Sequence, residues 1–598
     1  MRCAITSARA TLKKSGHCAE SPVLSSTPLT RNEQDISVSD IFGIAASWID
    51  ERSAAARGAL DSTPVLFQNC ESLPFGGVLL MLPFLLETGL LDYKSHYAPL
   101  APGYYDIDTI ILLLAFMYLC RIRNPEQFKH INPGEFGKLL GLDRIPEAKC
   151  FRGKVKQICA QEKSVAWNKE LAQKWSSEEE NSFYYIDGHV QVYHGYNATL
   201  GKKHVSRQKL CLPGVQEFWV NNAQGMPYFY VCGQVNEKLL QMIEEQIVPR
   251  LLDNMHLDEQ SHEDPMAPKM TLVFDREAYS PQFFRRLWEE HKIAVITYRK
   301  NVHDTWEEED FVEHEVEIDG VTTKMRLSEK QVELDGVKMR EVRKLSGDGH
   351  QTSILTTHPL LSITMVALYM FARWSQENFF RYLRLDYDFD KIAQYLVQQI
   401  DDEFMVVNPA HNKLEYQLKK AREKIARKKA GLYVLIEENV GSDLEQTPKF
   451  LQKKEKLETE LHGLKAEENK LIESREKMPK RIKISDMEHR YTQLDMESKL
   501  FRNIIKMICY RAETSLAALL CKDYKKAFNE KRAMAKSVIN TMCDLKPDYD
   551  SNILEVYLYT QATPRDNLAV EKLCRKLNEN NTKFPGTELT LVYKTTSM

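Results

Sequence analysis

The sequence predicts an α/β protein with a mixed five-stranded sheet, a β insertion, an N-terminal helical domain and long C-terminal helices. Three observations support this fold class. Aromatic and β-branched runs of strand length lie in the second quarter of the chain. Runs of helical periodicity surround and separate them, and two long stretches with a heptad seam follow. With 598 residues, the chain is long enough for roughly three to five domains.

The composition is that of a globular protein. Hydrophobic residues make up 43% of the chain and charged residues 28%, so we expect a soluble, folded protein. The formal net charge of -3 indicates that nucleic acid would be bound by local basic patches. The twelve cysteines are scattered singly and are expected to be reduced thiols of a cytoplasmic protein. No membrane partner is expected, because the longest apolar run, 78–91, is too short to cross a bilayer.

Changes in texture divide the chain into five regions. They are a mostly disordered leader (1–57), a helical region (58–176), an α/β core (177–400) with a β insertion at 301–359, a helical hairpin (401–485), and a helical region with a small α/β tail (486–598). The insertion is recognised by short β-like runs separated by turn signals such as Asp319-Gly320 and Asp335-Gly336.

A basic helix is predicted near the end of the first helical region. Residues 133–142, a tight turn and residues 147–158 have the order of a helix-turn-helix motif. In that interpretation Arg152, Lys154 and Lys156 face a DNA groove or its phosphates. An ordinary helical hairpin with a solvated basic face explains the pattern equally well.

The strands of the core are predicted in two groups. Residues 183–193, 216–220 and 227–232 form an antiparallel meander. Residues 270–275 and 293–298 are strands separated by a helix, which favours parallel pairing beside the meander and therefore a mixed sheet.

The long C-terminal stretches predict an antiparallel helical hairpin that is partly coiled. Apolar residues keep a heptad seam over 414–435 and over 450–471. Lysine and arginine are dense between 419 and 429. We expect a charged, solvated face there, with DNA contact as the less favoured alternative.

The run from 368 to 384 is predicted to be one continuous helix, because it contains no Gly or Pro. At about 100° per residue, one side is apolar and the other carries Met370, Arg373, Glu377, Arg381 and Arg384. One interpretation is a solvated face with the ion pairs Arg373–Glu377 and Glu377–Arg381. The other is an acid that holds a metal, among cations that hold phosphate oxygens.

Two further acids decide between these interpretations. Asp187 lies in the first predicted strand, and Asp275 ends the buried strand 270–275. Carboxylate oxygens of Asp187, Asp275 and Glu377 would suit Mg²⁺ or Mn²⁺ better than zinc. Two such ions can activate the attacking oxygen and stabilise the leaving oxygen at a phosphodiester. Two strand aspartates and a helix glutamate on a mixed sheet are the arrangement of ribonuclease-H-like nucleotidyl transferases.

At these motifs the sequence resembles bacterial insertion-sequence transposases of the DDE type. The matching segments are 185–190 at the first acid, 274–280 at the second, and Arg373-x3-Glu377-x6-Arg384 at the third. One branch of that family has a glutamate helix with the pattern Tyr-x2-Arg-x3-Glu-x6-Lys, preceded by a β insertion. In this chain Met370 stands at the tyrosine position and Arg384 at the lysine position.

The resemblance implies metal-dependent strand cleavage and strand transfer at the ends of an insertion sequence. Asp187, Asp275 and Glu377 would hold two Mg²⁺ or Mn²⁺ ions. The candidates for DNA contact are Arg373, Arg384, Arg381, Tyr298, Arg299 and Lys300. The implied partners are double-stranded DNA, as terminal inverted repeats and target, and a second copy in a synaptic homodimer. The implied location is the bacterial cytoplasm, in association with the nucleoid.

Two alternatives remain open. The near-neutral charge and the departures at Met370 and Arg384 also fit a catalytically inactive DNA-binding protein derived from a transposase. A structure-selective nuclease of the same fold would hydrolyse DNA without a joining step.

Overall fold

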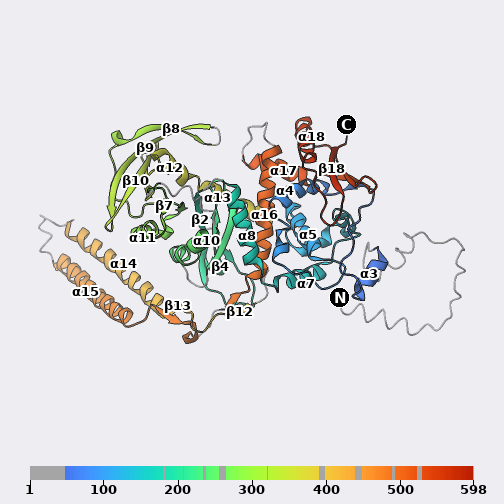
Figure 1. The fold of residues 1–598 in the computed structure, drawn as a ribbon. Helices are drawn as coiled ribbons and strands as arrows, with labels where there is room; N and C mark the ends of the chain where they lie inside the picture. The colour runs from blue at the N-terminus through green and yellow to red at the C-terminus, as the bar shows by residue number, and fades with distance from the viewer. Residues whose placement is uncertain are drawn as a thin grey trace, which may run out of the picture.

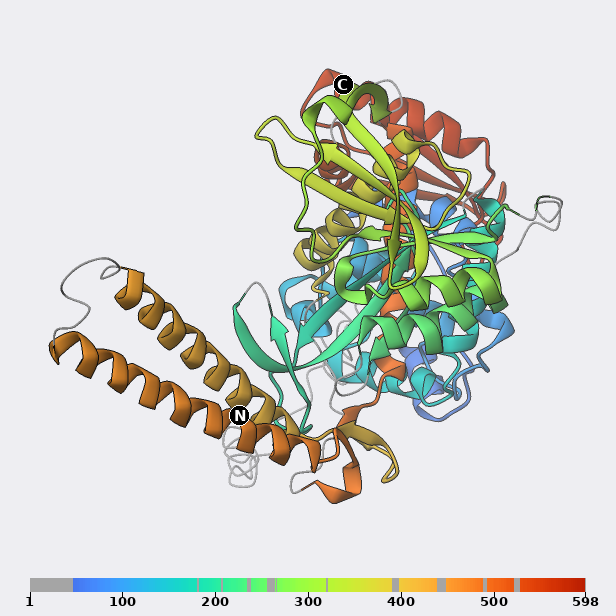
Figure 2. The same ribbon diagram turned by 90° about the vertical axis from the view of Figure 1, so that its left-hand side faces the viewer.

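A computed structural model describes residues 47–596 except 180–181, 206–207, 234–237, 255–263, 265, 319–320, 390–396, 438–447, 488–491 and 521–527. The fold is mixed α/β, as predicted, with a body of sheets and helices from which two long helices project (Figures 1 and 2). Most of the predicted leader and the Asp319-Gly320 turn lie outside the described residues. In the described part of the chain, no helix is both long and apolar enough to cross a membrane.

The N-terminal part is mainly helical. Its elements are α3 (Ile49–Ala56), β1 (Cys70–Leu73), η1 (Gly76–Met81), α4 (Leu82–Glu87), η2 (Asp92–Ser95), α5 (Ile107–Leu119), η3 (Pro125–His130), α6 (Pro133–Lys138), α7 (Ala148–Cys159) and α8 (Ser164–Glu178). α3 lies within the predicted leader and is attached by Arg52, whose guanidinium is 2.6 Å from the Asp143 carboxylate. α5 is apolar on nearly every side, so it lies in the interior.

Ten strands form the central sheet. They are β2 (Phe183–Val192), β3 (Lys202–Val205), β4 (Leu210–Asn221), β5 (Pro227–Gly233), β6 (Met270–Phe274), β7 (Ile293–Tyr298), β8 (Val312–Ile318), β9 (Val321–Leu334), β10 (Val337–Leu345) and β11 (Gln351–Thr356). β2, β6 and β7 pair in parallel, whereas β4 is antiparallel to both β2 and β5. The predicted mixed pairing is therefore confirmed. β6 is buried throughout, which explains its continuous apolar sequence.

The β insertion continues this sheet. β11 pairs with β7 in antiparallel fashion, and β10, β9 and β8 follow outward. The five predicted strands are consequently part of a larger sheet. The insertion is fixed at its root by Glu341, a fully buried carboxylate that pairs with Arg299 at 2.6 Å and with Arg343 at 2.7 Å.

Helices cover the sheet on both sides. They are α9 (Leu239–Met242), η4 (Ile243–Ile247), α10 (Val248–Asn254), η6 (Arg276–Ala278), α11 (Pro281–His291), α12 (Ile363–Phe371) and α13 (Trp374–Tyr387). Val366, Ala367 and Met370 of α12 pack in one cluster with Tyr185 and Val273 of the sheet. The prediction of one continuous helix over 368–384 is wrong, and so is the placement of Met370 on the polar side.

The break between α12 and α13 has a clear local cause. The carbonyl of Ala372 accepts a hydrogen bond from the Ser375 hydroxyl at 2.7 Å and from the Ser375 N–H at 2.9 Å. The same hydroxyl is 2.8 Å from the carbonyl of Ala223 in the β4–β5 turn. The Ser375 side chain thus replaces part of the backbone hydrogen bonding of the helix and connects the α12–α13 junction to the sheet.

The two projecting helices are α14 (Pro409–Glu437) and α15 (Pro448–Glu476), which we call the arm. The ion pairs Arg422–Glu468 and Lys428–Glu460 show that they run antiparallel. Short strand pairs form the base of the arm: β12 (Val397–Gln399) with β15 (Thr492–Leu494), and β13 (Met405–Val407) with β14 (Arg481–Lys483). The predicted helical hairpin is present in the structure.

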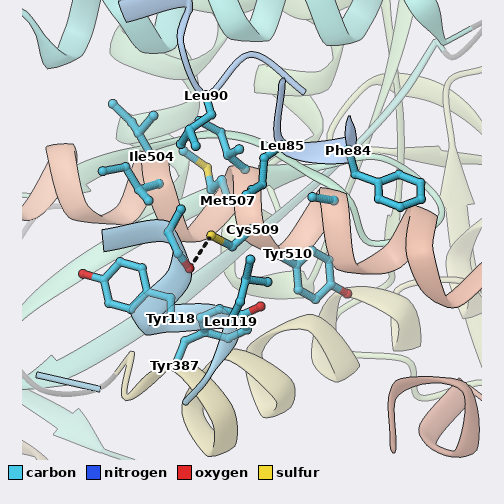
Figure 3. Packing of buried hydrophobic residues seen from close by; sticks show 14 of the residues in the cluster. Phe84, Leu85, Leu90, Tyr118, Leu119, Tyr387, Ile504, Met507, Cys509 and Tyr510 are labelled. Atoms are coloured by element: carbon cyan, nitrogen blue, oxygen red, sulfur yellow. Dashed lines mark hydrogen bonds between the residues drawn. The ribbon is translucent and has the colours of Figure 1, made fainter. Parts of the chain in front are cut away.

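The C-terminal part joins the N-terminal helices. Its elements are η9 (Ile484–Asp486), α16 (Glu497–Leu520), α17 (Phe528–Ile539), β16 (Cys543–Asp548), β17 (Ile553–Leu558), α18 (Pro564–Asn578) and β18 (Thr590–Thr595). α16 is buried along most of its length and packs on α4, α5, α7 and α8. Figure 3 shows part of this packing, where α16 meets α4 and α5. β1 completes a second sheet in the order β1-β16-β17-β18. The described N-terminal and C-terminal parts therefore share one core.

Candidate active site

Three side chains form a row across the sheet at the carboxyl ends of β6 and β7, where the parallel pairing of β2 with β6 also ends. Ile186 of β2 is opposite Phe274 of β6, and Phe274 is opposite Thr297 of β7. The next residues along these strands are Asp187, Asp275 and Tyr298, so they occupy neighbouring positions at one edge. The carboxyl ends of parallel strands are where α/β sheets bind ligands.

Arg373 supplies positive charge between the two aspartates. Its guanidinium is 3.8 Å from the Asp187 carboxylate and 3.9 Å from the Asp275 carboxylate. Arg373 lies at the junction of α12 and α13 and is only 9% exposed. Its Nε is buried and has no hydrogen-bond partner among the residues that the structure describes. A buried cation with a free donor between two acids indicates a site built for charged ligands.

The carboxylates of the site influence one another. Burial raises the pKa of Asp187 to about 6, while Arg373 and the N–H of Gly188, 2.9 Å from the carboxylate, oppose the rise. The negative charges of Asp275 and Glu377 raise this pKa further. Asp275 and Glu377 therefore both lie within electrostatic range of Asp187. Perturbed carboxylates of this kind concentrate at functional sites.

Glu377 is in the first turn of α13 and is exposed. The ion pairs of Arg373 run to Asp187 and Asp275. Among the described residues, neither Glu377 nor Arg381 forms an ion pair. This finding favours the second interpretation of the helix, in which Glu377 is available to a ligand, over a solvated face with i,i+4 pairs.

The donor set is suited to a hard divalent cation. Asp187, Asp275 and Glu377 offer only carboxylate oxygens, which Mg²⁺ and Mn²⁺ prefer. Within the described ranges, no three His, Cys, Asp or Glu side chains are already grouped as metal ligands. The positive charge of Arg373 lies close to Asp187 and Asp275 and offsets part of their mutual repulsion.

Tyr298 brings a hydroxyl to this row. Burial raises the pKa of Tyr298. The positive charge of Arg373 opposes this rise, whereas the negative charges of Asp275 and Glu377 add to it. No hydrogen-bond partner for its hydroxyl is found in the part of the chain that the structure describes. Met370 is buried in the core, and Tyr369 stacks on Phe183 with ring centroids 3.7 Å apart. Tyr298 is therefore the tyrosine that the fold places beside the acids.

The other cations predicted to contact DNA have different surroundings. Arg299 pairs with Glu341 at the root of the insertion, and the Lys300 ammonium lies 5.9 Å from the centre of the Tyr279 ring. Nε of Arg384 donates to the carbonyl of Phe380 at 3.2 Å. Arg381 is exposed and lines a pocket of about 210 Å³ with Asn378, Tyr382, Leu385, Asp386, Arg532, Ala533 and Lys536.

The three cations of the proposed helix-turn-helix lie apart from the acids, on α7. This helix buries Phe151 and Val155 and packs on α5 and α16. Arg152 pairs with Glu126, Lys154 is half-buried, and Lys156 is exposed. The structure thus brings Asp187, Asp275, Arg373 and Tyr298 together and leaves the α7 cations on a separate surface.

Sequence analysis missed Gln376, which positions the glutamate helix. Gln376 is 1% exposed and donates to Oδ1 of Asn221 at 2.9 Å and to the carbonyls of Tyr185 and Trp219 at 3.2 Å each. It fixes α13 directly beside Glu377. In the sequence only its position next to Glu377 could have drawn attention to Gln376. Its burial depends on contacts with residues about 150 to 190 positions away along the chain.

A buried carboxylate of α16 fixes the other end of α13. Glu513 accepts hydrogen bonds from Tyr382 and from Tyr387, the latter at 2.6 Å, and pairs with Arg121 at 2.7 Å. Burial opposes its ionisation, but Arg121 and Arg532 hold the pKa of Glu513 below its ordinary value. The network connects the glutamate helix to the helical core.

Comparison with protein families gives a match over nearly the whole chain. Residues 43–597 match a family model described as "Transposase protein", which covers the row of acids and both helical parts. A search of curated proteins finds no match.

Proposed function

Because the chain belongs to this transposase family, we propose that it is a DDE-type transposase that cleaves and transfers DNA strands in a metal-dependent reaction. The observation that carries the proposal is the convergence of Asp187 and Asp275 on Arg373, with Glu377 in electrostatic range. The sequence interval between these groups is large, so the fold has to assemble them.

The strand order supports a ribonuclease-H-like core. β5, β4 and β2 form an antiparallel set, and β6 and β7 continue from β2 in parallel. The first acid lies on β2, the second directly follows β6, and the third is in the first turn of α13, which comes after the β insertion and α12. This is the arrangement expected from the resemblance.

The chain's own residues would divide the work as follows. Asp187, Asp275 and Glu377 would hold two Mg²⁺ or Mn²⁺ ions through their carboxylate oxygens. Such ions, when bound, supply the positive charge that activates the attacking oxygen and stabilises the leaving oxygen. Arg373 would then be released from the aspartates to bind a phosphate oxygen, and Arg384 and Tyr298 would hold the flanking strand.

The proposed substrate is double-stranded DNA carrying the terminal inverted repeats of a bacterial insertion sequence, together with a target duplex. A synaptic homodimer would supply one active site for each end. Basic side chains on α7 and on α13 are candidate contacts for DNA outside the active site. The expected location is the nucleoid.

Strand cleavage tests this proposal directly. The protein is incubated with Mg²⁺ and duplexes that carry the inverted repeats flanking its gene. We expect nicks that leave 3′-hydroxyl ends, followed by joining of those ends to a target duplex. Cleavage of branched or unrelated DNA without joining would instead support a structure-selective nuclease. Binding without any metal-dependent cleavage would support the catalytically inactive alternative.

A further inference from the structure

The arm has a core on one side only. Leu418, Ala421 and Ile425 of α14 are buried, as is Leu461 of α15. Both helices project from the body (Figures 1 and 2). The side of α14 that faces away from α15 is therefore open to a partner.

Charge is distributed unequally between the two helices of the arm. α14 contains eight Lys and Arg residues and three Glu, whereas α15 contains seven of each kind. Three cations of α14 form ion pairs: Lys420–Glu423 at 3.0 Å, Arg422–Glu468 at 2.8 Å and Lys428–Glu460 at 2.6 Å. The other five form no ion pair with any described residue; they are Lys413, Lys419, Lys424, Arg427 and Lys429.

Part of this excess forms a row on the outer side of α14. At about 100° per residue, Lys413, Tyr416, Lys420, Lys424 and Arg427 lie within a sector of about 80° whose centre is turned away from the buried seam. Lys424 and Arg427 of this sector also line a pocket with Glu460, Gly463, Leu464 and Glu467 of α15. All five are exposed, and the Lys420 ammonium lies 5.7 Å from the centre of the Tyr416 ring. At 1.5 Å rise per residue the row is about 21 Å long. We define these five residues as the arm row.

Solvent exposure alone does not account for the arm row. α15 is equally exposed and has balanced charge, and the whole chain has a net charge of -3. A row of cations spaced at roughly one helical turn matches the repeating negative charge of a nucleic acid backbone. We infer that the arm row binds the sugar–phosphate backbone of duplex DNA without sequence specificity. This inference rests on the proposed function, because it takes DNA to be the substrate of the protein.

The salt dependence of DNA binding tests this inference. The full-length protein is titrated with a duplex of about 40 base pairs of arbitrary sequence over a range of roughly 50–300 mM salt. The test variant is Lys413→Gln/Lys424→Gln/Arg427→Gln. The matched control, Lys453→Gln/Lys456→Gln/Lys465→Gln, removes the same charge from exposed positions of α15. Glutamine keeps high helix propensity, so both variants should retain the arm.

We expect the test variant to bind at least about tenfold more weakly at low salt, with a slope of log K against log salt reduced by roughly three. The control should keep the wild-type slope. Equal slopes for both variants would overturn the inference, as would a change in the oligomeric state of the test variant with unchanged DNA binding. Metal-dependent cleavage is measured on the same samples. If cleavage persists without a slope difference, only the arm inference fails; a slope difference without cleavage removes the proposed chemistry and keeps the arm contact.

Discussion

The Arg373 guanidinium lies 3.8 Å from the Asp187 carboxylate, although 185 residues separate the two along the chain. The break between α12 and α13 brings this arginine to the carboxyl ends of β2 and β6, where it also meets Asp275. A planar guanidinium has donors on several sides, so one side chain can serve both acids. The relationship makes Arg373 the link between the glutamate helix and the sheet.

Replacing Arg373 by lysine should damage the site while keeping its charge. The donors of a lysine ammonium all lie on one nitrogen, whereas the guanidinium faces Asp187 and Asp275 with two different nitrogens held apart in one plane. We expect strand cleavage to fall about 10- to 100-fold, equivalent to roughly 1.4–2.7 kcal/mol of lost stabilisation. The measurement is the single-turnover cleavage rate. A rate equal to that of the wild type would show that the shared contact has no role in catalysis.

Asp187→Asn should stabilise the metal-free protein near neutral pH. Burial raises the pKa of Asp187 to about 6, above its ordinary value of 3.8. The folded state therefore binds a proton more tightly than the unfolded state, and the wild type loses stability as pH rises from about 4 to 6. Asparagine does not titrate, so the variant should gain about 1–3 kcal/mol at pH near 7.5.

The corresponding measurement is thermal unfolding in the presence of a chelator. The melting temperature of Asp187→Asn should exceed that of the wild type at neutral pH and approach it below about pH 3, where the aspartic acid is largely neutral in both states. An identical difference at both pH values would contradict the assignment of the effect to ionisation of Asp187.

Tyr298→Phe removes only a hydroxyl beside the acids. If that hydroxyl binds a phosphate oxygen during the reaction, its loss should lower the cleavage rate about 10- to 100-fold with little change in DNA affinity. Tyr185→Phe is the matched control, because the Tyr185 hydroxyl donates to the carbonyl of Tyr369 at 2.8 Å within the core. The control should reduce stability by about 1 kcal/mol and leave the rate per folded molecule unchanged. Equal rates for the two variants would remove Tyr298 from the site.

Glu513→Gln should destabilise the fold strongly. The substitution leaves the buried Arg532 and the half-buried Arg121 without the Glu513 carboxylate, and Arg121 keeps only its ion pair with Asp386 at 3.2 Å among described residues. The expected loss is about 3–5 kcal/mol in the free energy of unfolding. Glu460→Gln, which breaks an exposed ion pair with Lys428 on the arm, should cost less than about 1 kcal/mol. Denaturant unfolding compares the two variants, and similar losses would show that the buried network is not important for stability.

Local patterns predicted the strands of the core well. Buried parallel strands such as β6 need continuous apolar sequence, and turn residues separate the strands of the insertion. Asp187 and Asp275 could be located because each lies in or directly after such a strand. Their approach to Arg373 depends on the register of β2 with β6 and on the helix break at Ala372, which local patterns do not reveal.

Contacts between residues far apart in the sequence account for the features that local sequence patterns did not predict. The helix break at Ala372 contains no Gly or Pro and depends on a hydrogen bond from Ser375 to the carbonyl of Ala223. The pairing of β11 with β7, which extends the sheet, joins strands more than fifty residues apart. Likewise, α16 is buried because it packs on N-terminal helices, and no local pattern identifies those partners.

The central claim is that Asp275 acts with Asp187 and Glu377 in metal-dependent chemistry on DNA. The most direct measurement compares Mg²⁺-dependent strand cleavage and DNA binding for the wild type and Asp275→Asn. The account predicts that cleavage is abolished while the dissociation constant for the DNA ends stays within about threefold of the wild type, a difference of less than about 1 kcal/mol. Cleavage by Asp275→Asn at the wild-type rate would contradict the account.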